Sequence, residues 1–178
     1  MKRAIKVWDY AGTILEQTGK GALLTTKAEG KVNTMTIGWG TLGIEWGTPI
    51  CTVFVRESRY TKEMLDKNPE FTVNVPYGAC DKQILSLCGT RSGRDLDKIA
   101  ALGLTLEEPE KISVPGIREL PLTLECRVVY VQPQDLSVLE KPLCDRYYPQ
   151  DVDSSNPGSN RDAHIAFYGE IVASYIIE

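Results

Sequence analysis

Six stretches of the chain carry the alternating or densely apolar pattern that is typical of β-strands. They span residues 21–27, 33–41, 49–55, 71–75, 122–131 and 165–177. The first two flank a turn at Glu29-Gly30 and therefore predict a hairpin. In the stretch 122–131 every second residue is apolar, which predicts a half-buried antiparallel strand.

Three shorter stretches predict helices. Residues 58–68 begin with Ser58, a residue type that caps helices, and end before a proline. Residues 81–88 and 95–102 each stop at a glycine, where a left-handed C-terminal cap is expected.

The order of these elements shows no regular alternation of strand and helix. This favours a mainly β fold, an antiparallel barrel with a few short helices, over a doubly wound parallel sheet. Residues 132–163, hereafter the arm, contain several prolines and a polar run, and we expect them to be mostly loop. Long ordered loops are often lids or partner-binding segments. At 178 residues the chain predicts a single domain over 1–178.

Composition excludes several classes of protein. Hydrophobic residues make up 42% and charged residues 25% of the chain, as in ordinary globular proteins. The net charge of −4 argues against nucleic acid or an anionic membrane as a partner. No apolar stretch approaches the ~20 residues of a membrane helix. Lys6 and Asp9 interrupt any signal sequence, so a cytoplasmic location is expected.

The cysteines give no metal or disulfide framework. The five are odd in number and form no CxxC, and the chain has one histidine, so no zinc-ligand spacing is recognisable. We interpret them as reduced thiols that mostly serve packing, and we expect no metal site. The five are Cys51, Cys80, Cys88, Cys126 and Cys144.

Residues 38–43 match the glycine pattern of dinucleotide-binding proteins, but their context does not. That fingerprint requires a helix to open within it, so that helix amides receive the pyrophosphate. Here Gly47 and Pro49 follow almost at once, before the next strand. A glycine-bent strand or turn is the better interpretation.

Residues 56–61 offer the groups that bind a phosphate monoester. Two arginines, two hydroxyls and the free amides of a helix's first turn meet at this strand–helix junction. The alternative is that Ser58 merely caps the helix while the arginines lie in solvent. A second polar loop, 88–98, offers hydroxyls, a flexible backbone and Lys98, one helical turn past Arg94, although most such loops are only connectors.

No conventional catalytic set is recognisable. There is no Ser/His/Asp arrangement, and Cys88 has no neighbouring histidine to activate it, so a catalytic thiol is a minor option. His164 is more often a structural residue in such a position.

Four segments taken together, 33–39, 56–61, 71–76 and 92–98, resemble the flavin reductase-like FMN-binding split-barrel family, with the closest likeness to its flavoredoxin-type branch. The resemblance resumes at His164 and runs through Val172. It implies a six-stranded Greek-key split barrel, a homodimer, and FMN bound near the subunit interface. The arm matches no pattern of the family.

The resemblance also implies roles for individual residues. Arg56, Ser58, Arg59, Tyr60 and Thr61 would hold the FMN phosphate. Asn33, Thr34, Met35 and Thr36 would line the ring or ribityl chain, and Ser92, Gly93 and Lys98 would close the site. His164 matches a histidine that some reductases of the family place near the nicotinamide.

The function implied is an FMN-dependent oxidoreductase that accepts hydride from NADH or NADPH and passes electrons to flavin, a small acceptor or a redox protein. Flavin supplies its own reactivity, so the absence of a catalytic triad is no objection. Two alternatives remain: an FMN electron carrier with little NAD(P)H activity, and a non-enzymatic FMN-binding protein.

Overall fold

The computed structural model describes all residues, 1–178. Its strands are β1 (Lys2–Ala4), β2 (Ala22–Ala28), β3 (Lys31–Ile37), β4 (Gly40–Glu45), β5 (Thr48–Arg56), β6 (Glu70–Val75), β7 (Leu106–Glu107), β8 (Gly116–Ile117), β9 (Leu122–Pro133) and β10 (His164–Ile177). Its α-helices are α1 (Ala11–Lys20), α2 (Tyr60–Lys67), α3 (Lys82–Thr90), α4 (Lys98–Leu102) and α5 (Lys141–Tyr147), with 3-10 turns η1 (Val7–Tyr10) and η2 (Leu136–Val138).

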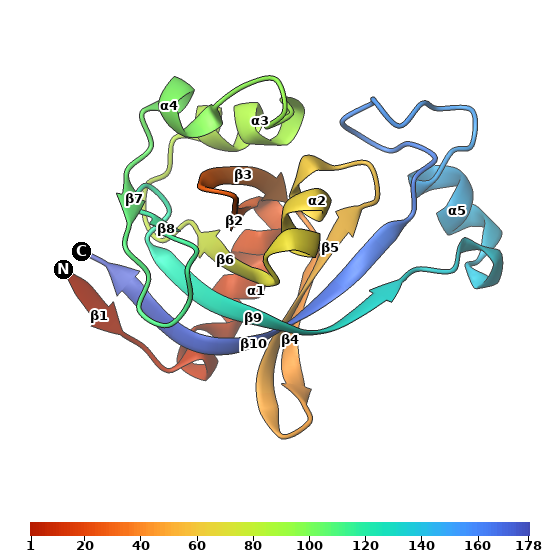
Figure 1. Ribbon diagram of the computed structural model, residues 1–178. Helices are drawn as coiled ribbons and strands as arrows, with labels where there is room; N and C mark the ends of the chain where they lie inside the picture. Colours follow the sequence, from red (N-terminus) through yellow and green to blue (C-terminus); the bar gives the residue numbers. More distant parts are fainter.

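The main sheet is antiparallel and curls into a barrel (Figure 1). Its strand order is β3-β2-β6-β9-β10-β5-β4, with β1 added on β10 beside the two chain termini. The end strands β3 and β4 are not hydrogen-bonded to each other, so the barrel is split at that seam. Helices α3 and α4 lie over β3, while α5 and the rest of the arm lie beyond the ends of β9 and β10 (Figure 1). The mainly β split barrel expected from the sequence is confirmed.

All six predicted strands are present, but one of them is divided. The stretch expected to be continuous over 33–41 ends at Ile37, and Gly40 begins β4, which forms a hairpin with β5. No helix opens at the 38–43 glycine pattern, so the exclusion of a dinucleotide fingerprint holds. The turn of this hairpin at Trp46-Gly47 has positive φ at both residues.

Two helices were not expected from the sequence. Helix α1 contains Gly12 and Gly19, which lower helix propensity, and its burial of Ile14 and Thr18 supplies the missing stability. Helix α5 lies inside the arm, where Pro142 occupies the first turn. Proline is tolerated in that turn, so a residue that suggested a loop marks a helix start instead.

The helix ends differ from the predicted ones at several positions. Helix α2 begins at Tyr60 with Arg59 as its N-terminal flanking residue and no side-chain cap, so Ser58 does not cap it. Helix α3 continues through Gly89 to Thr90, and Gly89 is not left-handed. Helix α4 does end at Gly103 in the left-handed conformation, as predicted, although it begins at Lys98.

Strand β9 is buried on both faces over Leu122–Cys126 rather than half-buried. One face joins the main core, and the other carries Glu125, which is fully buried. The Glu125 carboxylate accepts backbone N–H groups of Glu110 and Lys111, both at 2.7 Å, and the Tyr175 hydroxyl at 2.8 Å. A loop closed over the sheet therefore hides a face that the alternating pattern assigned to solvent.

The five cysteines are free thiols. Cys51 and Cys126 pack in the main core and Cys88 in the smaller apolar cluster under α3, in agreement with a packing role. Cys80 and Cys144 are partly exposed. None of the helices has the length and apolarity that crossing a membrane requires.

Candidate flavin-binding site

Two adjoining cavities lie where β3 approaches the junction between β5 and α2. The first, of about 350 Å³, is polar and extends under the loop between α3 and α4. The second, of about 250 Å³, lies between the end of β3 and the end of β5 and is lined by aromatic side chains. Both are lined by Met35, Arg59 and Pro157, so they meet at those residues.

Lys98 is the most unusual residue of the polar cavity. The residue is only 4% exposed, yet the ammonium has a single hydrogen-bond acceptor, the Arg91 carbonyl at 3.2 Å. Burial is the main cause that lowers the pKa of Lys98; the Cys88 thiol opposes this shift and Arg59 adds to it. A buried ammonium without a counter-ion is costly, and an anion in the cavity would remove that cost.

Arg59 projects between the two cavities. Its Nη2 donates to the carbonyls of Asn156 and Pro157 at 3.0 and 2.9 Å, which leaves Nε and Nη1 without a partner in the chain. Burial lowers the pKa of Arg59; the Asp162 carboxylate opposes the shift and Arg94 adds to it. Neither Arg59 nor Lys98 forms an ion pair.

Arg56 has a different role. It is buried, and its guanidinium donates to the carbonyls of Tyr147, Asn160 and Asp162 at 2.9, 3.3 and 2.5 Å. It also lies over the Tyr148 ring, 5.1 Å from the centroid. Arg56 thus fixes the arm against β5, and it lines the aromatic cavity rather than the polar one.

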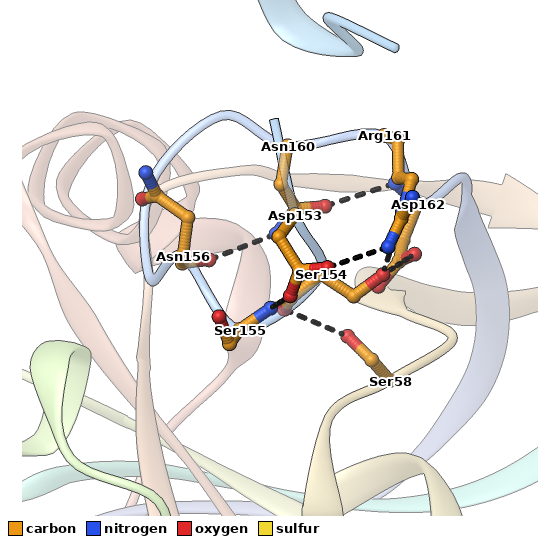
Figure 2. Close-up of polar contacts among 8 residues, drawn as sticks. All are labelled: Ser58, Asp153, Ser154, Ser155, Asn156, Asn160, Arg161 and Asp162. Carbon is orange, nitrogen blue, oxygen red and sulfur yellow. Dashed lines mark hydrogen bonds and ion pairs between the residues drawn. The ribbon is translucent and has the colours of Figure 1, made fainter. Parts of the chain in front are cut away.

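The last part of the arm forms a hydrogen-bonded lobe beside Ser58 (Figure 2). Ser154 donates from Oγ to Asp162 Oδ1 at 2.5 Å, and Arg161 pairs with Asp153 at the same distance. Burial would raise the pKa of Asp162, but the nearby hydroxyls of Ser154 and Ser58 and the charges of Arg56 and Arg161 lower it overall. Asp162 Oδ2 is buried with no hydrogen-bond partner.

Asn33, Thr61 and Gly93 form the wall of the polar cavity nearest to α4. Asn33 Nδ2 donates to Thr61 Oγ1 at 3.1 Å, which joins β3 to α2. The Gly93 Cα lies so close to this pair that an added Cβ would collide with Asn33 Oδ1 and lie 2.9 Å from Tyr60 Cδ1. Only glycine therefore fits at this position without movement of the wall.

Trp39 and His164 face each other in the aromatic cavity, with ring centroids 4.9 Å apart. His164 is 8% exposed, and its Nδ1 lies 2.8 Å from the Tyr148 hydroxyl. Burial lowers the pKa of His164 to about 3, and the charges of Arg56 and Arg59 contribute. The imidazole is therefore neutral at pH 7.

The structure brings most of the residues predicted from the sequence together. The polar cavity is lined by Asn33, Met35, Ser58, Arg59, Tyr60, Thr61, Ser92, Gly93 and Lys98. Thr36, Arg56 and His164 line the aromatic cavity. Thr34 lies away from both: its hydroxyl is fully buried and bonded to Thr25 Oγ1 and the Leu24 carbonyl.

Other residues of the two cavities were not among those predicted. Arg94 lines the polar cavity, pairs with Glu63 and lies over the Tyr60 ring; its place in the polar loop 88–98 was the available signal. Ser154, Ser155 and Pro157 come from the arm. Their polar, proline-containing sequence is typical of any loop and carries no signal for this site.

Comparison with known proteins agrees with this geometry. Residues 18–178 match the family described as flavin reductase like domain, and the chain belongs to that family. An uncharacterized protein of Archaeoglobus fulgidus is 37% identical over 99 residues, which cover 56% of this chain and 55% of the relative. The match thus spans about half the length of that relative.

Solved structures show the same architecture. Flavoredoxin from Methanosarcina acetivorans is 31% identical with a TM-score of 0.64, and the match covers 89% of this chain and 68% of that one. An FMN-binding domain of a flavin reductases-like enzyme from Shewanella baltica has a TM-score of 0.67 at 19% identity, and the match covers 99% of this chain and 77% of that one. The second likeness supports the fold alone.

Proposed function

We propose that the protein binds FMN and acts as a flavin-dependent oxidoreductase. The observation that carries this proposal is the pair of cations Lys98, which is buried, and Arg59, which is half-buried. Neither forms an ion pair, and both line a polar cavity that adjoins an aromatic one. One half suits a phosphate and the other a flat, largely apolar ring system. With a net charge of −4, the field of the whole chain does not attract anions, so this local arrangement must hold the phosphate.

The residues present fit FMN at both ends. Lys98, Arg59, Ser58 and Thr61 supply charged and hydroxyl donors at the phosphate end. Met35 lies where the cavities meet, and Trp39 and Phe54 supply contact area at the ring end. Arg56 would act indirectly, because its donors already hold the arm that covers the site.

Bound FMN would supply the hydride and electron chemistry, with NADH or NADPH as the donor. The chain's own contribution is to bind FMN, orient it and cover its site. The lobe of the arm around Ser154 and Pro157 restricts water at the polar cavity. Neutral His164 lies in the aromatic cavity, where a redox partner of the ring would have to approach.

The likeness to flavoredoxin at 31% identity favours a second candidate, an FMN electron carrier that receives electrons from another protein and reacts poorly with NAD(P)H. Anaerobic mixing of the FMN-loaded protein with each dinucleotide separates the two. Bleaching of the long-wavelength flavin band by either one supports the oxidoreductase. A loaded protein that is bleached by a chemical reductant and by neither dinucleotide would be a carrier, and a protein that takes up no FMN would contradict both.

A further inference from the structure

Three side chains from different parts of the fold meet beside the aromatic cavity, which His164 lines. His164 is the first residue of β10, Gln134 follows the end of β9, and Tyr148 follows α5 in the arm. The Gln134 backbone N–H donates to the His164 carbonyl at 2.9 Å, which fixes these two residues side by side. The Tyr148 hydroxyl lies 2.8 Å from Gln134 Oε1 and 2.8 Å from His164 Nδ1.

The hydrogen atoms available to Gln134, Tyr148 and His164 determine which atom donates in each of the two contacts. A tyrosine hydroxyl has one hydrogen, and an amide oxygen can only accept. Both 2.8 Å contacts are therefore hydrogen bonds only if Tyr148 donates to Gln134 and His164 Nδ1 donates to the Tyr148 oxygen. Because the ring is neutral at pH 7, the other nitrogen, Nε2, then carries a lone pair and no hydrogen.

The charges around the cavity favour the same arrangement. The unprotonated nitrogen is the negative end of the neutral imidazole dipole. Nε2 makes no hydrogen bond within the chain and is not a buried unsatisfied atom, so it faces the cavity that His164 lines. Arg56 and Arg59 are the charged residues of that cavity wall, and both attract a lone pair more than an N–H.

We propose that Tyr148 and Gln134 are positioning residues that hold His164 as the Nδ1–H tautomer, so that Nε2 presents a hydrogen-bond acceptor to the aromatic cavity. The group recognised there is an uncharged N–H or O–H donor on the redox partner, because a lone pair repels a phosphate or carboxylate oxygen. This use of the acceptor rests on the proposed flavin function, whereas the tautomer does not. The arm thereby sets the chemistry of the cavity as well as covering it.

The tautomer can be read directly, because the chain has one histidine and so one pair of ring nitrogens. Long-range ¹H–¹⁵N correlation spectra of the flavin-free protein at pH 7 distinguish a protonated ring nitrogen from an unprotonated one. We expect the Nδ1–H form to exceed the Nε2–H form about tenfold, as one hydrogen bond allows. A wild-type spectrum dominated by Nε2–H would overturn the proposal.

Variants of the exposed Gln134 test these two linked hydrogen bonds without removing a core residue. In Gln134→Leu the Tyr148 hydrogen is free to turn to Nδ1, so the ring should change to the Nε2–H form. Gln134→Glu keeps an oxygen that only accepts at pH 7 and should retain Nδ1–H. Gln132→Leu is the matched control, because Gln132 contacts Tyr168 instead, and it should leave the tautomer unchanged.

Tyr148→Phe should also abolish the preference for Nδ1–H, and the Gln134 variants decide the question if that buried variant does not fold. An unchanged tautomer in Gln134→Leu, with thermal unfolding like that of wild type, would refute the role of Gln134. All these spectra are taken without flavin. A failure to bind FMN would thus contradict the proposed function and leave the tautomer result standing.

Discussion

At the scale of single residues, Lys98 shows how a binding site can oppose stability. Its ammonium is buried and has one hydrogen-bond acceptor, the Arg91 carbonyl. Burial lowers the pKa of Lys98, which reflects the cost of keeping the ammonium charged there. Residues that are unfavourable in the empty protein are expected at functional sites, where stability is exchanged for binding.

Lys98→Met tests this interpretation, since methionine keeps most of the volume and removes the charge. We expect the flavin-free variant to be more stable than wild type by about 1 kcal/mol, because an unpaired buried charge is lost. FMN binding should weaken at least tenfold, because a charged hydrogen bond is lost as well. Thermal unfolding and FMN titration measure the two effects, and a variant that is both less stable and equal in FMN affinity would show that Lys98 is structural.

His164 predicts a pH dependence of stability. Its pKa is lowered to about 3 in the folded protein, while an unfolded histidine has a pKa near 6.5. Between these values the unfolded chain binds a proton that the folded protein does not, so stability falls as the pH decreases through this window. The loss from this group between pH 7 and pH 5 amounts to about 2 kcal/mol of the free energy of unfolding.

Urea unfolding at pH 7 and pH 5 measures that loss, and His164→Asn is the control that cannot titrate. The carboxylates contribute equally to both proteins, so the difference between their pH slopes isolates His164. Parallel slopes would mean that His164 titrates normally in the folded protein and is not buried as described.

At the scale of elements, strands were predictable from the sequence because burial of alternate side chains leaves a direct pattern. What the pattern could not supply is which faces other segments cover. The alternating pattern places Glu125 on the solvent face, but the loop that carries Glu110 and Lys111 covers that face. A bulge between Ile171 and Ala173 likewise changes the face of β10, so that Ile176 enters the main core and Tyr175 turns to Glu125.

The packing around Gly169 of β10 leaves no room for a side chain. A Cβ there would lie 2.5 Å from Phe71 Cζ and 2.8 Å from Cys126 Cβ, closer than such atoms approach. Gly169→Ala should therefore destabilise the protein by about 1–3 kcal/mol. Gly43→Ala on β4 is the matched control, because a Cβ there meets nothing within 4 Å. Chemical denaturation of both variants gives the comparison, and equal stabilities would refute this packing.

At the scale of the whole molecule, we predict a homodimer. Trp46, Tyr130 and Tyr168 form an aromatic patch on the hairpin and the β9–β10 ribbon, with ring centroids 5.3 to 6.3 Å apart. Trp46 is 60% exposed and Tyr130 46%, and contiguous exposed aromatic side chains mark interaction surfaces.

Analytical ultracentrifugation at micromolar concentration should give twice the chain mass. Trp46→Asn should weaken the association at least tenfold, and asparagine tolerates the positive φ of that position. Trp8→Ser removes an exposed tryptophan outside the patch and should have no effect. A wild-type sedimentation mass of one chain would contradict the prediction.

The candidate site was predictable where one segment carries several donors, as in 56–61 and 92–98, because local sequence places those side chains together. The roles within a segment were not predictable. Arg56 and Arg59 are three residues apart, and both donate to carbonyls of the arm, yet only Arg59 also lines the polar cavity and keeps donors without a partner in the chain. That division depends on the arm, whose return across the site no local pattern indicates.

The central claim is that Arg59 and its neighbours hold the phosphate of FMN, and riboflavin, which lacks that phosphate, provides the direct test. Titration of both flavins into wild type and Arg59→Ala yields two affinity ratios. We predict that wild type strongly prefers FMN and that Arg59→Ala reduces this preference by roughly ten- to a hundredfold, the value of a charged hydrogen bond, while riboflavin affinity stays nearly the same. An FMN-to-riboflavin affinity ratio that Arg59→Ala leaves unchanged would contradict the account.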